Sequence, residues 1–151
     1  MSQPPGTQPS IHASCVRIGD WGVLIRGPSG SGKSTLALRL ILDPPRALPP
    51  AQLVADDRVL LSADADGVTA AAPPALAGLI EVRQLGIRRL PHIDAARLHL
   101  IVDLGCADIP RMPTGAQLTT LLLGHSVPRL AFSQDSDGAL MIAAALLTAS
   151  H

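Results

Sequence analysis

The chain has 151 residues and carries twelve acidic and twelve basic residues, so its formal net charge at pH 7 is zero. This balance argues against a nucleic acid or an anionic membrane as a partner, since both attract an excess of positive charge. Hydrophobic residues make up 47% of the sequence, which excludes a disordered chain and suits one compact domain.

The charged residues are skewed in type. All cationic residues except Lys33 are arginines, and all acidic residues except Glu81 are aspartates. A codon bias explains the skew but not the places of the two exceptions. Cys15 and Cys106 have neither zinc-ligand spacing nor a disulfide framework, which favours a reduced, cytoplasmic setting. The N-terminus lacks a signal-peptide pattern, and no apolar run reaches the roughly 18 residues of a membrane span.

The sequence predicts a loose polar tail over residues 1–9 and one domain over residues 10–151. A strand is expected over Ile11–Ile18. The turn signal Gly19–Asp20 joins it, in a hairpin, to a buried strand over Trp21–Arg26. A mostly buried helix is expected after residue 34.

That helix must end near Asp43, because two prolines follow it. A short strand over Leu53–Ala55 comes next. The later predicted elements are a hairpin of Arg58–Leu61 with Val68–Ala71, a turn from Pro73, strands at Ile80–Arg83, Leu98–Leu104, Leu118–Leu123 and Arg129–Phe132, and a helix from Asp135 or Ser136 to Ala149. The fold class is therefore mixed α/β, with more strands than helices.

A phosphate-binding motif lies between the predicted buried strand and the predicted helix. Residues 27–34 read GPSGSGKS and match G-x-x-x-x-G-K-[ST]. Backbone N–H groups at a helix N-terminus would bind phosphates, Lys33 would reach the β and γ phosphates, and Ser34 would bind Mg²⁺. The residues assigned to nucleotide binding are Gly27, Pro28, Ser29, Gly30, Ser31, Gly32, Lys33, Ser34 and Thr35.

Three carboxylates are candidates for chemistry. Asp56 and Asp57 end a short strand, where two carboxylates suit metal binding and proton acceptance; strand alternation predicts that one of them faces the nucleotide. The alternative is a turn or a solvated edge. Glu81 stands between apolar residues, so a half-buried carboxylate with a cation or a metal is expected. The alternative is an exposed glutamate or a structural pair with Arg83.

Histidine and arginine residues give weaker signals. His12 lies on the first strand and is either structural or functional. Arg111 lies in a proline-flanked loop and is either a charge-stabilising arginine or a surface residue. The remaining histidines near the chain's later strands show no ligand spacing and are interpreted as structural.

These motifs together resemble the C-terminal catalytic domain of the HPr kinase/phosphorylase family. The resemblance rests on SIHA at residues 10–13, GVLIRGPSGSGKSTLAL at 22–38, LVADDRV at 53–59 and AAPPALAGLIEVRQLGI at 71–87. It implies a P-loop kinase core similar to that of PEP carboxykinases. It also implies ATP- and Mg²⁺-dependent phosphorylation of a serine in HPr, the phosphocarrier of the sugar phosphotransferase system, and a hexameric assembly.

By position, the resemblance implies that Lys33 binds phosphate and that Ser34 and Glu81 bind Mg²⁺. Asp57, in preference to Asp56, matches the proton acceptor. In the same way His12 matches the motif histidine, and Arg111 matches a later functional arginine.

Departures from the family pattern are also informative. From the length of the chain we expect no separate N-terminal domain, as in truncated proteobacterial members, and Gln84 replaces a signature glycine. Residues 133–138 read SQDSDG, which places two acids where the family has a basic segment linked to phosphorolysis. We therefore expect a kinase without efficient phosphorylase activity.

Two other functions remain open at the level of sequence. The first is a P-loop kinase for a small metabolite, which would need a lid with clustered arginines; only Arg88–Arg89 comes close. The second is a non-catalytic nucleotide-sensing module that regulates a partner protein.

Overall fold

A single strand, β9 (Ala95–Asp103), organises the sheet of this mixed α/β protein. The computed structural model describes residues 9–133 and 135–149, so most of the expected N-terminal tail lies outside the described residues. The other elements are β1 (Ser10–Ile11), β2 (Ser14–Ile18), β3 (Trp21–Arg26), α1 (Lys33–Leu42), β4 (Gln52–Ala55), β5 (Val59–Ala63), β6 (Val68–Ala71), the 3-10 turn η1 (Pro74–Leu76), β7 (Leu79–Val82), β8 (Gly86–Arg89), η2 (Gly115–Gln117), β10 (Thr119–Leu122), β11 (His125–Ala131) and α2 (Gly138–Leu147).

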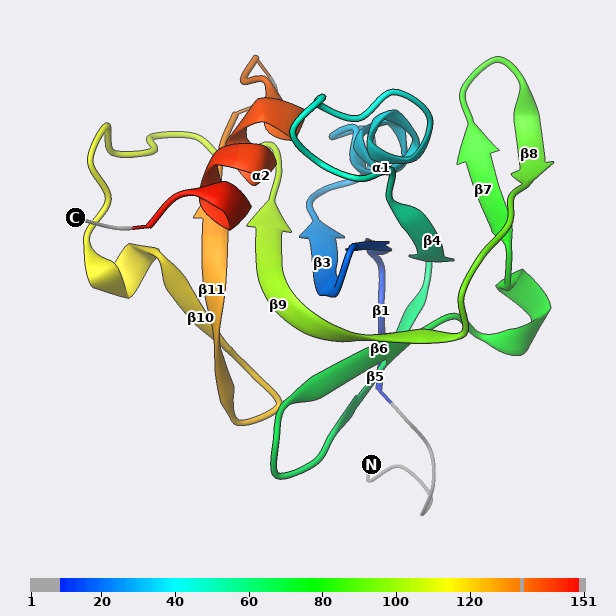
Figure 1. Ribbon diagram of the computed structural model, residues 1–151, viewed down its shortest axis with the longest axis horizontal. Coiled ribbons are helices and arrows are strands. Elements are labelled where there is room, and N and C mark those ends of the chain that lie inside the picture. The colour runs from blue at the N-terminus through cyan, green and yellow to red at the C-terminus, as the bar shows by residue number, and fades with distance from the viewer. Residues whose placement is uncertain (1–8, 134, 150–151) are drawn as a thin grey trace.

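β9 curls so that its two halves belong to different parts of the sheet (Figure 1). Its first residues pair antiparallel with β6, in the order β1-β5-β6. Its later residues run parallel to β3 and to β11, while β2 and β4 extend the sheet beyond β3. Gly22 is required where β3 meets β9, because a Cβ atom there would lie 2.1 Å from the carbonyl oxygen of Arg97.

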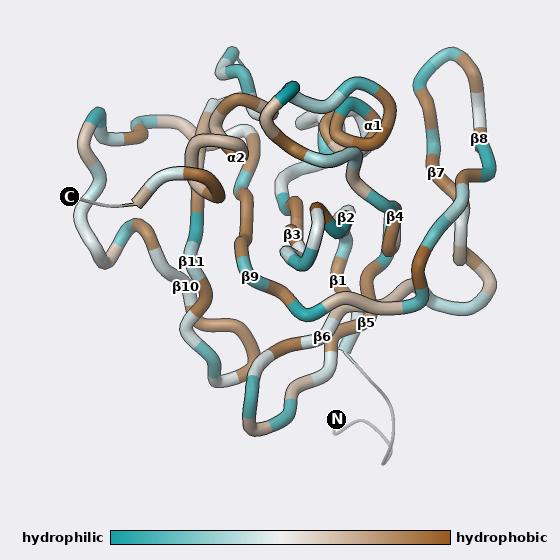
Figure 2. The backbone as a smooth tube through the Cα atoms, viewed as in Figure 1, coloured by the Kyte–Doolittle hydropathy of each residue, from teal (hydrophilic) through white to brown (hydrophobic). Residues whose placement is uncertain are grey.

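The curl creates two hydrophobic cores, one on each face of the central strands. Val23 and Ile25 of β3 pack on the side of α1 and α2, in a cluster that includes Ile142. Leu24, between them, faces the β5–β6 side with Leu61. Figure 2 shows the corresponding hydrophobic stretches along β3 and β9. Both faces are covered, which explains why β3 reads as a continuous apolar run.

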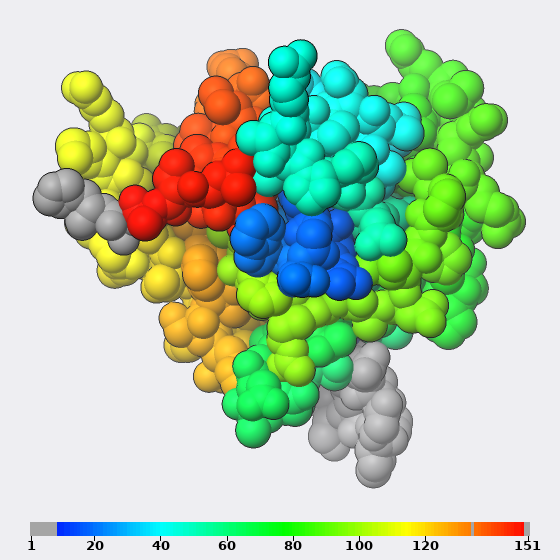
Figure 3. Space-filling model, viewed as in Figure 1, coloured from blue at the N-terminus to red at the C-terminus, as the bar shows by residue number. Residues whose placement is uncertain are grey.

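Several expectations are confirmed. β2 and β3 form the antiparallel hairpin across Gly19–Asp20, and β5 and β6 form the second hairpin. α1 ends at Leu42, directly before the two prolines, as their chemistry requires. In Figure 3 the blue β2–β3 turn lies beneath the cyan segment that includes α1 and the loop after it.

Other expectations are wrong in detail. The strand expected over Ile11–Ile18 is two strands, because β1 pairs with β5 whereas β2 pairs with β3 and β4. α1 is less buried than expected, since Leu42 is 66% exposed. β7 pairs with β8, a strand that was not predicted, in a separate two-stranded sheet.

The end of the chain also differs from expectation. The last strand, β11, covers His125–Ala131 and begins earlier than predicted. Asp137, rather than Asp135 or Ser136, caps α2, because its carboxylate accepts a hydrogen bond of 3.1 Å from the N–H of Leu140. The helix ends at Leu147 and does not extend to Ala149. No helix within the described residues is long and apolar enough to span a membrane.

An ion cluster holds the three parallel strands together where they end. Asp103 of β9 accepts hydrogen bonds of 2.8 and 2.9 Å from Arg26 of β3 and one of 2.5 Å from Arg129 of β11. Burial raises the pKa of Asp103, but the hydrogen bonds and charges of the two arginines outweigh it and hold the pKa below its usual range. Arg26 directly precedes the GPSGSGKS segment, so the cluster anchors the start of that loop.

We predict that Asp103→Asn lowers the free energy of unfolding at pH 7 by about 3 kcal/mol, because two guanidinium groups lose their carboxylate. The folded-state pKa is depressed, so this stabilisation is present above the unfolded pKa of about 3.9 and disappears as pH falls through the folded value. Urea unfolding of both proteins at pH 7 and at low pH measures the difference. The matched control is Asp64→Asn, which removes a similar but exposed pair with Arg97 and should cost less. Equal losses in the two variants would contradict the prediction.

Candidate functional site

The Gly-rich loop connects β3 to α1, as its motif requires. Gly30 and Gly32 have φ values of +81° and +97°, in the left-handed region that glycine adopts without steric cost. Gly32 is also the N-cap residue of α1, and no side chain caps this helix end. The first turn of α1 contains no acidic residue either. The positive end of the helix is therefore not neutralised by its own side chains and favours an anion.

Lys33 is the first residue of α1, and its side chain reaches back to the backbone of the loop. Its side chain is buried, and Nζ donates hydrogen bonds to the carbonyl oxygens of Gly27 at 2.8 Å and Pro28 at 3.1 Å. A compact ammonium on a long stem can reach these two oxygens, whereas the wider guanidinium of arginine has a different geometry. The ammonium charge is thus held at the base of the loop.

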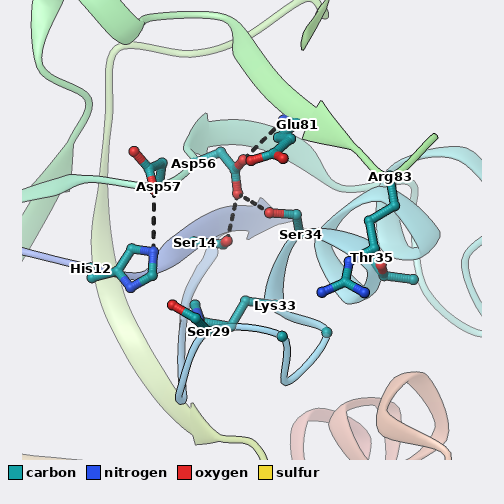
Figure 4. A pocket seen from close by; sticks show the side chains of 12 residues that line it. His12, Ser14, Ser29, Lys33, Ser34, Thr35, Asp56, Asp57, Glu81 and Arg83 are labelled. Carbon is teal, nitrogen blue, oxygen red and sulfur yellow. Dashed lines mark hydrogen bonds and ion pairs between the residues drawn. The ribbon is translucent and has the colours of Figure 1, made fainter. Parts of the chain in front are cut away.

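A pocket of about 250 Å³ opens beside this loop (Figure 4). It brings together segments that are far apart in the sequence, from His12, which lies in the bend between β1 and β2 and not on a strand as expected, to the β7–β8 hairpin. Its lining residues are His12, Ser14, Ser29, Gly30, Gly32, Lys33, Ser34, Thr35, Asp56, Asp57, Glu81 and Arg83. Most residues singled out from the sequence are in this set, but Gly27, Pro28, Ser31 and Arg111 are not.

Asp56 is the most buried acid of the pocket, at 3% exposure. Its Oδ1 accepts hydrogen bonds from Ser14 Oγ at 2.6 Å and from Ser34 Oγ at 2.8 Å. Its Oδ2 accepts one of 3.2 Å from the backbone N–H of Glu81. These three donors come from β2, α1 and β7, so one carboxylate connects three elements and is satisfied without a cation.

Asp57 has a different environment, although it is adjacent to Asp56. Its side chain is 65% exposed, and Oδ1 lies 3.2 Å from Nε2 of His12. Strand alternation predicted that only one of the two carboxylates faces the site, and this is wrong because both line the pocket. β4 ends at Ala55 and Asp57 adopts a φ of +68°, so the alternation of a strand does not apply to the pair.

Glu81 is more exposed than expected. Its Ile80 neighbour is buried, but its own side chain is solvent-accessible and lines the pocket. The alternative in which Glu81 pairs with Arg83 is not seen, since the ion pairs found among the described residues do not include this one. Figure 4 shows Glu81 near Asp56, with Arg83 directed toward Thr35.

Arg111 is not brought together with the other candidates. It lines a different cavity of about 290 Å³, next to Cys106, Arg129 and Met141. The structure instead places Arg83 at the pocket, a residue that sequence reasoning treated only as a possible partner of Glu81. Cys15 is a core residue, and burial raises the pKa of its thiol to about 12.

Ser14 is the pocket residue that the sequence did not indicate. We predict that Ser14→Ala destabilises the fold by about 1.5–3 kcal/mol, because a buried carboxylate loses one of its donors. Urea unfolding at pH 7 measures the change. The control is Ser126→Ala, which alters an exposed serine on β11 and should have almost no effect. A Ser14→Ala protein as stable as the parent would show that Asp56 does not depend on this hydrogen bond.

Comparisons with known proteins show the family to which the chain belongs. Residues 6–99, well over half of the chain, match the family model described as HPr Serine kinase C-terminal domain. The chain is 46% identical over 79 residues to "HPr kinase/phosphorylase" of Lacticaseibacillus casei (strain BL23), which covers 52% of this chain and 23% of that protein. It is 44% identical over 103 residues to "HPr kinase/phosphorylase 1" of Oceanobacillus iheyensis, covering 63% of this chain and 31% of the relative. The matched segment is thus a minor part of those proteins.

A solved structure resembles nearly the whole chain. It is the Hpr(Ser) kinase/phosphatase from Coxiella burnetii, with a TM-score of 0.72 and 27% sequence identity. The match covers 89% of this chain and 86% of that one. The fold class expected from the sequence is confirmed by this match. On the family model and the structural similarity, the chain belongs to the family of HPr serine kinase C-terminal domains.

Proposed function

We propose that the protein is an ATP- and Mg²⁺-dependent kinase that phosphorylates a serine of an HPr-type phosphocarrier. The observation that carries the proposal is the single pocket in which a buried lysine, a helix-terminal serine and three acidic residues converge. Family membership supports the choice of substrate, since the relatives are named for HPr. Phosphoryl transfer depends mainly on positioning and electrostatic stabilisation, which the residues of this pocket would supply.

The phosphate chain of the nucleotide would lie along the Gly-rich loop. Lys33 holds its ammonium at the base of the loop through two backbone carbonyls, so it is oriented before any phosphate arrives. The uncapped N-terminus of α1 adds positive potential. Together these groups would bind the β and γ phosphates and stabilise the negative charge that develops during transfer.

The residues present fit a magnesium ion. Mg²⁺ takes oxygen ligands and is commonly held by one or two carboxylates with substrate phosphates and water. The hydroxyl of Ser34 donates a hydrogen bond to Asp56. The lone pairs of Ser34 Oγ therefore remain available to a metal. Glu81 offers an exposed carboxylate at the same pocket. Ser34 and Glu81 would therefore hold the ion, which would neutralise phosphate charge, and Asp56 would orient Ser34.

Asp57 is better placed than Asp56 to accept the proton of the attacking serine hydroxyl. Its carboxylate is exposed and lines the pocket, whereas Asp56 is buried and both of its oxygens already accept hydrogen bonds. A general base must come within hydrogen-bond reach of the proton that it removes, which requires access to the substrate. His12, at 3.2 Å, would hold the Asp57 side chain in place.

Efficient phosphorolysis is not part of the proposal. Asp135 and Asp137 stand in the segment where the family has basic residues, and Asp137 is committed to capping α2. Two negative charges there would repel an approaching inorganic phosphate.

We predict that Asp57→Asn lowers kcat for HPr phosphorylation about 10²–10⁴-fold, because the amide cannot accept the proton. Binding of Mg²⁺–ADP should be unchanged, since Asp57 does not hold the phosphates. Mass spectrometry of HPr from the same organism, incubated with ATP, measures transfer, and calorimetry measures binding. Full activity in Asp57→Asn would remove its assignment as base. Tight ADP binding by the parent protein without any transfer would favour a nucleotide-sensing module instead.

The metal assignment gives a separate prediction. Ser34→Ala and Glu81→Gln should each raise the Mg²⁺ concentration that supports ADP binding by about tenfold or more, because each removes an oxygen ligand. Calorimetric titration of ADP at a series of Mg²⁺ concentrations measures this shift. Asp20→Asn, which changes a fully solvated aspartate in the β2–β3 turn, is the control. Unshifted magnesium curves in both variants would contradict the assignment.

A further inference from the structure

A second cavity, of about 560 Å³, continues from the phosphate pocket along α1 toward the start of α2. The two cavities share four lining residues, Gly30, Gly32, Thr35 and Arg83, so they adjoin each other, and we call them together the groove. The second cavity has the size of typical small-molecule sites, which range from about 300 to 1,000 Å³.

The lining of the second cavity combines apolar and polar groups. Leu36, Leu104 and Phe132 provide apolar surface from α1, from the segment after β9 and from the segment after β11. Ser133 and Ser136 add hydroxyl groups at the side, and the latter is exposed. A flat apolar ring attached to a polar sugar matches this combination of surfaces.

The direction of the groove can be read from the two ends of the phosphate pocket. In Figure 4, Asp57 and His12 lie at one end, and Thr35 and Arg83 lie at the opposite end. If the acceptor hydroxyl is at Asp57, the phosphate to be transferred must lie on that side. The rest of the phosphate chain then runs past Ser34 toward Thr35, where the second cavity begins.

Arg83 marks this junction. Its Nη2 lies 3.4 Å from the place where a Cβ of Gly30 would be, so the guanidinium lies beside the Gly-rich loop. Arg83 lines both cavities, and none of the ion pairs found among the described residues includes it. A guanidinium in such a position binds phosphate oxygens well.

We propose that the second cavity holds the base and ribose of the nucleotide, and that Arg83 binds the phosphate nearest to the ribose. The inference rests on the proposed function, because it takes a nucleoside triphosphate as the substrate. It adds the part of the site that distinguishes a nucleotide from a simple polyphosphate.

The test compares two ligands that share a diphosphate but differ in the nucleoside. Calorimetry measures binding of Mg²⁺–ADP and Mg²⁺–pyrophosphate to the full chain. We expect the parent to bind ADP at least tenfold more tightly than pyrophosphate. Ser136→Trp, which fills the groove from its edge, should remove most of that difference and leave pyrophosphate binding unchanged. Leu140→Trp, an exposed position of α2 outside the groove, should keep the full difference.

Arg83→Gln provides a second variant that does not depend on filling space. It should weaken binding of ADP about tenfold while circular dichroism and unfolding curves stay unchanged, since Arg83 is exposed on the β7–β8 hairpin.

The possible failures are distinguishable. If neither ADP nor pyrophosphate binds to the parent, the proposed function itself fails. If both bind equally well, or if Ser136→Trp leaves ADP binding intact, the groove does not hold the nucleoside. If Ser136→Trp keeps ADP binding but weakens binding of HPr, the cavity belongs to the protein substrate and the inference is overturned.

Discussion

The pocket depends on one buried carboxylate, that of Asp56. A carboxylate at 3% exposure is costly unless donors surround it, and here β2, α1 and β7 each provide one. The hydrogen bonds therefore tie the Gly-rich loop, through Ser34, to the β7–β8 hairpin, through the N–H of Glu81. All three donors are neutral, so none of them compensates the charge of the carboxylate. A cation at this place would gain from that charge without having to displace an arginine.

The Asp103 cluster uses the opposite solution at a neighbouring strand end. Asp103 also ends a central strand, but two arginines neutralise it. Arginine pairs of this kind fix backbone positions and leave no net negative charge for a metal. The two aspartates therefore have different roles. Asp103 anchors the start of the Gly-rich loop through Arg26, and Asp56 orients the hydroxyl of Ser34 at the end of the loop. The same residue type serves structure in one place and, in our proposal, chemistry in the other.

Local signals in the sequence were sufficient to predict the elements whose start and end are marked by nearby glycine, lysine or proline residues. The β3–loop–α1 unit could be predicted because an apolar run, glycines and a lysine stand next to each other, and two prolines end the helix. β8 could not, because all four of its residues are exposed and their pattern has no period of two. Ser14 could not be identified either, since its partner Asp56 lies 42 residues away and serine is common. The composition was more informative, because the single lysine and the single glutamate both line the pocket.

The backbone at Asp57 has a consequence for how this protein can change. Its φ of +68° is a conformation that costs a residue with a Cβ atom roughly 1–2 kcal/mol, and glycine avoids that cost. Yet glycine has no carboxylate, and the proposed chemistry needs one at this exposed position. Selection for a more stable chain and selection for phosphoryl transfer therefore act in opposite directions on a single codon. A lineage that no longer needed the reaction would gain stability by losing its base, and glycine at this position would be the mark of that loss.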